Sequence, residues 1–162
     1  QLAKGVSPVK EESLSGVSRK SGLLVRPLGV GSVLLEARAV TEPDLITDSS
    51  IENLFSLKDN IVKIDLRNTS ITNRSLEMLA SFPRLKNLNL MGSSIDSSGV
   101  RFLNANQNLE TLNLVNTQVS DSLTKTLISM PALRQVHLWK SNFSKDGIST
   151  LRRKAVKLKV SF

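Results

Sequence analysis

The chain has 162 residues, of which 40% are hydrophobic, and its 22 basic and 14 acidic side chains give a formal net charge of +8. It has no cysteine, which excludes disulfides, a cysteine-ligated zinc site and a cysteine nucleophile, and it has no run of about 18 apolar residues that could span a bilayer. These values predict one domain with its own apolar core and leave the compartment open.

The first residues differ in composition from the rest. Residues 1–22 are rich in Ser, Lys, Glu and Gly without a sustained apolar period, which predicts a linker or flexible N-terminal arm. We expect one domain over residues 23–162. Its first stretch, residues 23–29, is either an N-terminal cap strand in a hairpin or an unpaired loop. Because the chain opens with Gln1 rather than Met, we expect a trimmed part of a longer protein.

A six-residue apolar frame, Leu-x-x-Leu-x-Leu, recurs every 24 residues and is the strongest signal in the sequence. The frames are Ile61-x-x-Ile64-x-Leu66, Leu85-x-x-Leu88-x-Leu90, Leu109-x-x-Leu112-x-Leu114 and Leu133-x-x-Val136-x-Leu138. A constant step of this length is typical of leucine-rich repeats, which place one short parallel strand and one helix in each turn. The sequence therefore predicts a right-handed α/β solenoid with a concave parallel sheet and helices on the convex side.

The remainder of each repeat supports this prediction. A polar turn, an apolar anchor such as Ile71 or Ile95, and a helix with apolar spacing of three or four follow each frame. We expect about five repeats, starting near residues 30, 61, 85, 109 and 133, and a terminal strand at 157–162. In the first repeat we match Val33-x-Leu35 and Val40-Thr41-x-x-x-Leu45 to Ile64-x-Leu66 and Ile71-Thr72-x-x-x-Leu76. Seven extra residues would then lengthen its helical side through Ile51, Leu54 and Leu57.

The residues between the core leucines point to the other face of each strand and should form rows across the sheet. The three expected rows are Lys63, Asn87, Thr111 and Gln135; Asp65, Asn89, Asn113 and His137; and Arg67, Met91, Val115 and Trp139. Trp139 is either a partner contact or a side chain that folds over its neighbours and seals the inner face. From these rows we predict the partner-binding residues Arg67, Asn89, Met91, Asn113, Val115, Gln135, His137 and Trp139.

Charge is unevenly distributed along the chain. Residues 1–60 carry 7 basic and 8 acidic side chains, whereas residues 61–162 carry 15 and 6. The densest basic run is Arg152, Arg153, Lys154, Lys157 and Lys159. This run is the alternative site, for a polyanion such as nucleic acid or an anionic surface. A solvated, solubilising end is the preferred interpretation, because the chain has no Tyr and one Trp to stack on bases.

The sequence offers little for catalysis. His137 is the only histidine, and three strand spacings would separate it from Asp65, roughly 14 Å. We therefore expect no enzyme, no metal and no cofactor in this chain. Asn89 and Asn113 are expected to satisfy each other's hydrogen bonds, with a polar ligand as the alternative.

Three segments resemble the cysteine-free, ribonuclease-inhibitor-like leucine-rich repeats of bacteria, whose form is L-x-L-x-x-T-x-V/I-T-D-x-G-L-x-x-L. They are Leu88–Leu103, Leu112–Asp121 and His137–Ile148, although Ser97-Ser98, Ser122-Leu123 and Ser144-Lys145 depart from the pattern. Leu138-Trp139 with Gly147-Ile148 is similar to the last repeat of bacterial membrane proteins that join a c-type cytochrome domain to a C-terminal repeat region. That resemblance implies an exported, periplasmic or membrane-associated part of a larger haem protein, whose Cys-x-x-Cys-His motif is absent here.

We thus predict a noncatalytic interaction or scaffold domain that binds another protein, or a neighbouring domain of its own full-length chain, through the concave strand face. An inert structural spacer is the third interpretation. We expect a monomer without a transmembrane segment, and we consider nucleic acid the less favoured partner.

Overall fold

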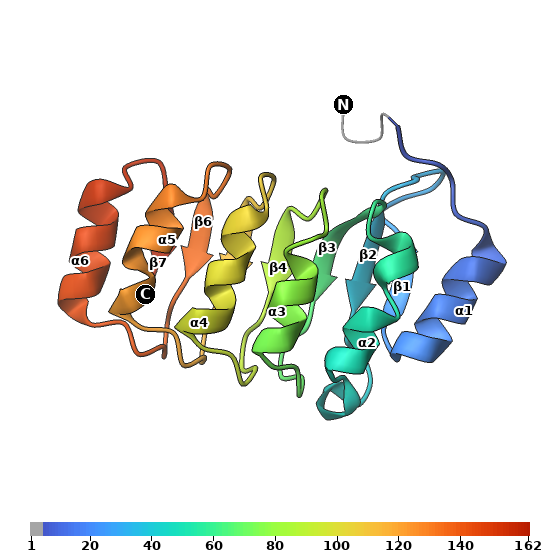
Figure 1. Cartoon of the computed structure of the whole chain (residues 1–162), viewed down its shortest axis with the longest axis horizontal. Coiled ribbons are helices and arrows are strands. Elements are labelled where there is room, and N and C mark those ends of the chain that lie inside the picture. The colour runs from blue at the N-terminus through green and yellow to red at the C-terminus, as the bar shows by residue number, and fades with distance from the viewer. Residues whose placement is uncertain (1–4) are drawn as a thin grey trace.

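The computed structural model describes residues 5–162 and has one seven-stranded sheet whose strands follow one another in chain order (Figure 1). The first two strands pair antiparallel and all later neighbours pair parallel. This arrangement confirms the expected α/β class. The strands are β1 (Leu24–Pro27), β2 (Leu35–Arg38), β3 (Ile61–Asp65), β4 (Asn87–Asn89), β5 (Thr111–Asn113), β6 (Gln135–His137) and β7 (Lys159–Ser161).

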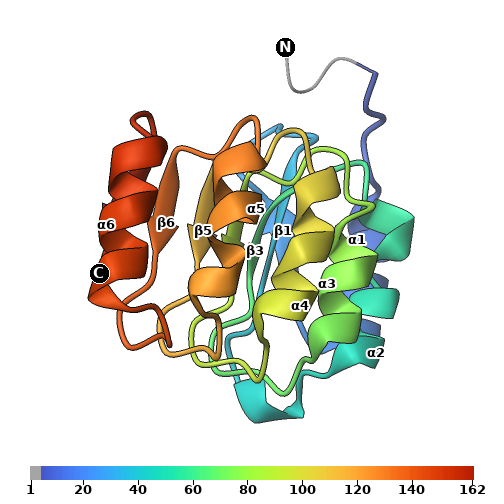
Figure 2. The ribbon, with the colours of Figure 1, turned by 60° about the vertical axis from the view of Figure 1, so that its left-hand side comes forward.

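The helices form one layer against one face of the sheet, as Figures 1 and 2 show from two sides. They are α1 (Glu11–Ser21), α2 (Asp48–Glu52), α3 (Asn73–Leu79), α4 (Ser97–Val100), α5 (Thr124–Ser129) and α6 (Lys145–Lys154). Short 3₁₀ segments extend the layer at η1 (Pro43–Leu45), η2 (Phe55–Leu57), η3 (Arg101–Ala105) and η4 (Asp121–Leu123). The other face of the sheet carries no helix of the described residues, and we call it the open face.

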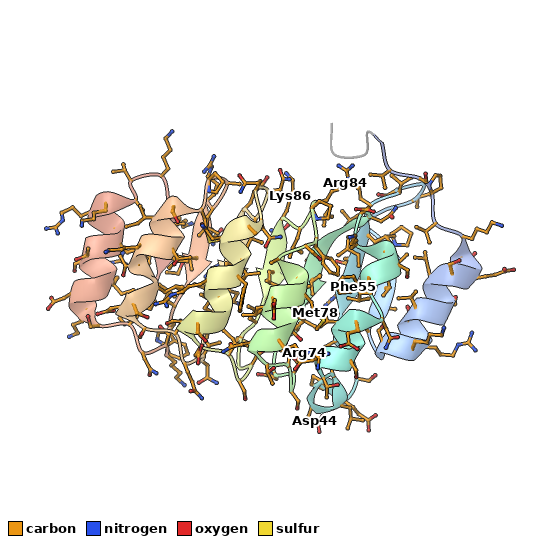
Figure 3. All side chains as sticks on the ribbon, in the orientation of Figure 1. Asp44, Phe55, Arg74, Met78, Arg84 and Lys86 are labelled. Carbon is orange, nitrogen blue, oxygen red and sulfur yellow. The ribbon has the colours of Figure 1, made fainter. Side chains whose placement is uncertain are left out.

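The apolar core lies between the sheet and the helical layer. The frame residues of β3 to β6 are buried there, for example Leu88, Leu112 and Val136, which are at most 1% exposed and directly aligned across neighbouring strands. On the helical side Phe55 of η2, labelled in Figure 3, packs edge-on against Phe82, with ring centroids 5.8 Å apart. Because each turn buries only one face of its own residues, neighbouring turns must stack to close the core.

The prediction of a linker over residues 1–22 is wrong for Glu11–Ser21, which form α1; residues 1–4 lie outside the described part. Glu11 lies in the first turn and Arg19 in the last, so both favour the helix dipole. Gly22 ends the helix in the left-handed region at φ 73°. Sequence periodicity missed this helix because Leu14 is its only buried large apolar residue, and packing against β1 and α2 supplies the rest.

The stretch 23–29, for which the sequence left a strand and a loop open, contains β1. Its partner is β2, in an antiparallel register that aligns Val25 with Ala37. Leu23 and Val25 are buried, so this strand extends the core to the N-terminal side of the parallel strands. The hairpin covers what would otherwise be an unpaired edge at β2.

The first repeat is aligned differently from the sequence prediction. Ala37, not Val33, aligns with Ile64 across β2 and β3. The apolar anchor is Ile46, which is 3% exposed, whereas Val40 is 57% and Leu45 65% exposed. Ile46 also accepts a hydrogen bond through its carbonyl from the Ser70 amide, as Ile95 does from Gln118. Ile46 follows Ala37 by nine residues (46 − 37), whereas Ile71 follows Ile64 by seven (71 − 64), so the loop around η1 holds two extra residues rather than seven. The buried residues Ile51, Leu54 and Leu57 are the ordinary helical side of this turn.

Hydrogen bonds between successive turns run along the edge of the molecule where the helices begin. The side chain of the first helical residue accepts a bond from the backbone amide that precedes the next helix, at 2.9 to 3.2 Å. We call these four residues the edge ladder: Asp48, Asn73, Ser97 and Asp121, which bind the amides of Thr72, Asp96, Ser120 and Ser144 respectively.

The edge ladder sets which residue can occupy the third helical position of the next turn. A Cβ built on Gly99 would lie 2.2 Å from Asn73 Oδ1, and one on Gly147 would lie 1.9 Å from Asp121 Oδ1. The shorter Ser97 precedes Leu123 instead, which is buried. Asn73 and Asp121 are thus paired with glycine and the shorter Ser97 with leucine, whereas Asp48 meets Ser75, whose hydroxyl donates to Asp48 Oδ1 at 2.5 Å. In the first three pairs a larger ladder side chain goes with a smaller residue in the next turn, which conserves packing volume.

Candidate binding surface

The structure brings two predicted rows together on the open face. Strand register aligns Lys63, Asn87, Thr111 and Gln135, and it aligns Asp65, Asn89, Asn113 and His137. β2 adds Glu36 to the first row and Arg38 to the second, and β7 adds Lys159 and Ser161. The face is therefore a polar surface with six aligned positions in each row.

The third row, Arg67, Met91, Val115 and Trp139, lies directly after the strands. The strand pairing continues past it, since the amides of Asn68, Gly92 and Asn116 donate to the carbonyls of Met91, Val115 and Trp139. The residue after each member of the row has a left-handed φ between 54° and 72°, which turns the chain away from the sheet: Asn68, Gly92, Asn116 and Lys140. This turn fixes the position of the row in every repeat.

Trp139 projects into solvent at the C-terminal end of that row. Its side chain is 56% exposed, and the Lys140 Nζ lies 4.5 Å from its ring centroid. Met91 and Val115 are partly buried beside it in the row. An exposed aromatic ring with a cation over one face is a suitable anchor for a partner, because its apolar area is not yet removed from water.

Asn89 and Asn113 do not hydrogen bond to each other, contrary to the sequence prediction. Each Oδ1 instead accepts a bond from the backbone amide two residues later, Met91 N at 3.2 Å and Val115 N at 3.0 Å. A backbone amide can only donate, so the accepting atom must be the oxygen. Within residues 5–162 the two Nδ2 groups have no hydrogen-bond acceptor. The local turn thus leaves both carboxamides as free donors on the open face.

Two buried carboxylates lie at the N-terminal end of the open face. Glu36 is 5% exposed and accepts from Arg26 Nε at 2.7 Å, with Lys63 Nζ at 3.4 Å. Burial raises the pKa of Glu36, but the bonds from Arg26 and Lys63 outweigh it and hold that pKa below its ordinary value. Asp65 pairs with Arg67, whose Nη2 lies 2.5 Å from Asp65 Oδ2, and this bond raises the pKa of Arg67.

The rows border a shallow depression of about 300 Å³. Sequence reasoning missed Arg38 here, because its position depends on the register of β2, and it left Lys63, Asn87 and Thr111 out of the binding set although it had aligned them. At the far end Gln135 Nε2 and His137 Nε2 form a hydrogen bond at 3.0 Å. The side chains that line the depression are Arg38, Lys63, Asp65, Arg67, Asn87, Asn89, Thr111, Asn113 and His137.

The C-terminal basic run does not gather on one surface. Lys159 is aligned with Gln135 on the open face, whereas Lys154 and Lys157 line a groove of about 290 Å³ between the end of α5 and the loop before β7. Arg152 uses its Nη2 to donate to the Val160 carbonyl at 3.1 Å. Arg152, Arg153 and Lys154 all lie in the last turn of α6, where cations favour the helix dipole. The fold therefore gives this run several separate roles.

Groups of three or more His, Asp or Glu side chains that could hold a metal ion do not occur among residues 5–162. Over the same residues, no helix has both the length and the apolar content needed to cross a bilayer.

Among known proteins, solved structures are similar to this chain in fold. No family model matches the chain, and no curated protein matches its sequence. The fold is similar to the solved structure of Leiomodin-1 Actin-Binding Site 2 (ABS2), with a TM-score of 0.53 and 16% sequence identity over 93% of this chain and 91% of that chain. At this identity the likeness is one of fold alone, and it extends over almost the whole of both chains.

Proposed function

We propose that the chain is a noncatalytic interaction domain, built as a right-handed leucine-rich-repeat solenoid of five repeats, that binds a partner protein or a neighbouring domain through its open face. The repeat assignment is supported by the parallel pairing of β3 to β7, where residues 24 apart are aligned. Such stacks present one long surface to a partner rather than an enclosed pocket.

The observation that carries the proposal is the state of the polar side chains on the open face. A structural role would have them bond to one another across the strands, but Asn89 and Asn113 leave their Nδ2 donors unused. The exposed ring of Trp139 lies at one end of the same surface. Free donors beside an exposed aromatic anchor are the features of a binding surface.

The narrower resemblance to repeat regions of cytochrome-containing membrane proteins supports a further part of the proposal. If it holds, the domain works outside the cytoplasm as part of a larger haem protein, and its binding surface faces an exported partner. The residues that support this location are Leu138-Trp139 and Gly147-Ile148.

The test is affinity capture from a lysate of the source cell with wild-type domain beside the double variant Trp139→Ala/Met91→Ala. We expect a protein that wild type retains at high salt and the double variant loses. Phe102→Ala is the matched control, because Phe102 is 45% exposed and lies on the helical layer in η3. Equal capture by wild type and the double variant would contradict the proposal.

The polyanion alternative predicts a different pattern in the same experiment. Neutralising several phosphates makes affinity fall steeply with salt. Nucleic acid recovered only at low salt, and lost from Lys154→Gln/Lys157→Gln, would favour the groove that these two residues line.

A further inference from the structure

We propose that the depression on the open face binds an extended acidic segment of the partner protein. The inference rests on the proposed function and specifies the chemistry of the partner. The residues expected to bind the acidic segment all line the depression and have hydrogen-bond donors in their side chains: Arg38, Lys63, Arg67, Asn89 and Asn113.

The first reason is an excess of hydrogen-bond donors. The Oδ1 atoms of Asn89 and Asn113 are occupied by backbone amides, so only their Nδ2 groups face an incoming ligand unpaired. Asn87 and Thr111 can act either way. A partner that supplies carboxylate or carbonyl oxygens would therefore satisfy groups that the fold itself leaves unsatisfied.

The second reason is the balance of fixed charge. Arg67 is paired with Asp65, and Lys63 is paired with Glu36, but Arg38 forms no hydrogen bond or ion pair with its side chain within residues 5–162. The N-terminal half of the open face has a net charge of +2 (4 − 2). Its cations are Arg26, Arg38, Lys63 and Arg67, and its anions are Glu36 and Asp65. Charge-assisted bonds to carboxylates are the strong ones available to such a site.

The dimensions of the depression suit a short extended peptide. It reaches from Arg38 on β2 to His137 on β6, which is four strand spacings. At about 4.8 Å per spacing the span is roughly 19 Å, or about six residues of extended chain. Glutamate or aspartate at alternate positions of such a segment would place its oxygens on one side, toward the donors.

A polyphosphate backbone fits the same surface less well. The buried Asp65 lines the depression, and the buried Glu36 lies next to it as the partner of Lys63. A dense row of phosphates would therefore meet one fixed anion in the depression and a second one beside it. No Phe, Tyr or Trp side chain among the described residues lines the depression, so His137 offers the single ring on which a base could stack. The local charge of +2 is closer in magnitude to the three carboxylates at alternate positions of a six-residue segment than to the charge of a nucleic-acid strand.

The proposal is tested by titrating ¹⁵N-labelled domain with an end-capped hexaglutamate peptide and following the side-chain amide signals of Asn89 and Asn113. We expect both signals to shift and saturate, and no shift with hexaglutamine. Asn89→Asp should weaken binding about tenfold, because it replaces a donor with an anion, and Arg38→Gln should weaken it about threefold. Aspartate is tolerated at this position of the row, since Asp65 accepts from the Arg67 amide as Asn89 does from Met91.

Arg153→Gln is the matched charge control, because Arg153 is exposed on the last turn of α6, away from the depression. It should bind hexaglutamate as wild type does. Equal shifts with hexaglutamine, or the same loss in Arg153→Gln as in Arg38→Gln, would overturn the proposal. Tighter binding of a thymidine hexanucleotide than of hexaglutamate at those amides would assign the depression to nucleic acid instead.

Failure of this inference can be separated from failure of the proposed function. A partner that depends on Trp139 and Met91 but is held equally well by Asn89→Asp would refute the acidic segment and leave the interaction domain standing. A partner that is held equally well by wild type, by Trp139→Ala/Met91→Ala and by Asn89→Asp would refute the proposed function as well.

Discussion

Two sets of polar side chains recur at equivalent positions of successive turns, and only one of them links each turn to the next. The edge ladder residues Asp48, Asn73, Ser97 and Asp121 each bond to a backbone amide of the next turn. On the open face Asn89 and Asn113 bond only within their own turn and leave their amino groups free. The same residue types therefore hold the stack together at one place and remain available to a partner at the other.

The comparison shows that recurrence in sequence does not distinguish structural from binding residues. What distinguishes them is whether the next turn offers a complementary group. At the edge the next turn offers a backbone amide that begins a helix and would otherwise be unpaired. On the open face Asn89 and Asn113 accept from an amide of their own turn, and the neighbouring strands, within the described part of the chain, offer their Nδ2 groups no acceptor. Side chains above a paired sheet are thus free to vary with the ligand.

The largest effect is expected from removing one ladder residue that serves several donors. Asp48 accepts from Thr72 N at 2.9 Å, Thr72 Oγ1 at 2.7 Å and Ser75 Oγ at 2.5 Å. Asp48→Ala should lower the free energy of unfolding by about 2–3 kcal/mol, because hydrogen bonds to a charged acceptor are lost and their donors are left unpaired. Urea unfolding followed by circular dichroism measures it, and a change below about 0.5 kcal/mol would mean that the ladder does not hold the turns.

A somewhat smaller effect is expected where glycine meets the ladder. Gly147→Ala should cost about 1–2 kcal/mol, because the new methyl group meets Asp121 Oδ1. In an Asp121→Ser background, which copies the Ser97–Leu123 arrangement, the same alanine should be nearly neutral. A double-mutant cycle on the free energy of unfolding measures this coupling. Additive effects of Gly147→Ala and Asp121→Ser would refute the proposal that the two side chains compete for the same space.

Acid should weaken the ladder in a defined pH range. Burial raises the pKa of Asp48, but the hydrogen bonds from Ser75 and Thr72 outweigh this effect and hold that pKa below the ordinary 3.8. Hydrogen bonds from Ser98 likewise lower the pKa of Asp96 below 3.8. The unfolded chain then binds protons more readily than the folded one, so this stability is complete above pH 3.8 and is lost as pH falls through the lowered values. The urea midpoint of wild type should fall between pH 5 and pH 2.5, and Asp48→Asn should show a shallower fall. An equal slope in both would exclude Asp48 as a contributor.

The smallest effect is expected on the outer surface of the helical layer. Arg74, labelled in Figure 3, pairs with Glu52 at 2.5 Å, but the two side chains are 67% and 47% exposed. Arg74→Gln should change the free energy of unfolding by less than about 0.5 kcal/mol, because water and salt screen such pairs. A loss above 1 kcal/mol would show that exposed pairs also hold the turns together and would weaken the contrast with the edge ladder.

The regular part of the fold could be predicted because the apolar frames mark the core positions of each strand and their constant spacing indicates stacked turns. The frame residues from Ile61 to Leu138 are buried as expected. The first repeat was misaligned for two reasons. The core position of β2 is occupied by the small Ala37, and the exposed Val40 and Leu45 have the same spacing as the buried apolar residues of the next repeat. Helix α1 escaped detection because one buried leucine gives no period.

The candidate surface was predictable as rows but not as chemistry. Row membership follows from strand alternation, and the structure aligns the rows as expected. The free donors of Asn89 and Asn113 depend on which backbone amide each Oδ1 accepts from, and the position of Arg38 depends on the register of β2. Neither property can be predicted from the apolar pattern. The free donors arise from local turn geometry, and the position of Arg38 arises from pairing between distant segments.

The most direct test of the account compares one substitution at two positions, Asn73→Asp in the edge ladder and Asn89→Asp on the open face. Each variant would be measured for its urea midpoint and for capture of the partner held by wild type. Asn73 donates to Asp96 Oδ1 at 2.9 Å, so Asn73→Asp should lower the midpoint and retain capture. Asn89→Asp should leave the midpoint unchanged and weaken capture. Equal loss of stability in both, or retained capture by Asn89→Asp, would contradict the division of roles between the two sets.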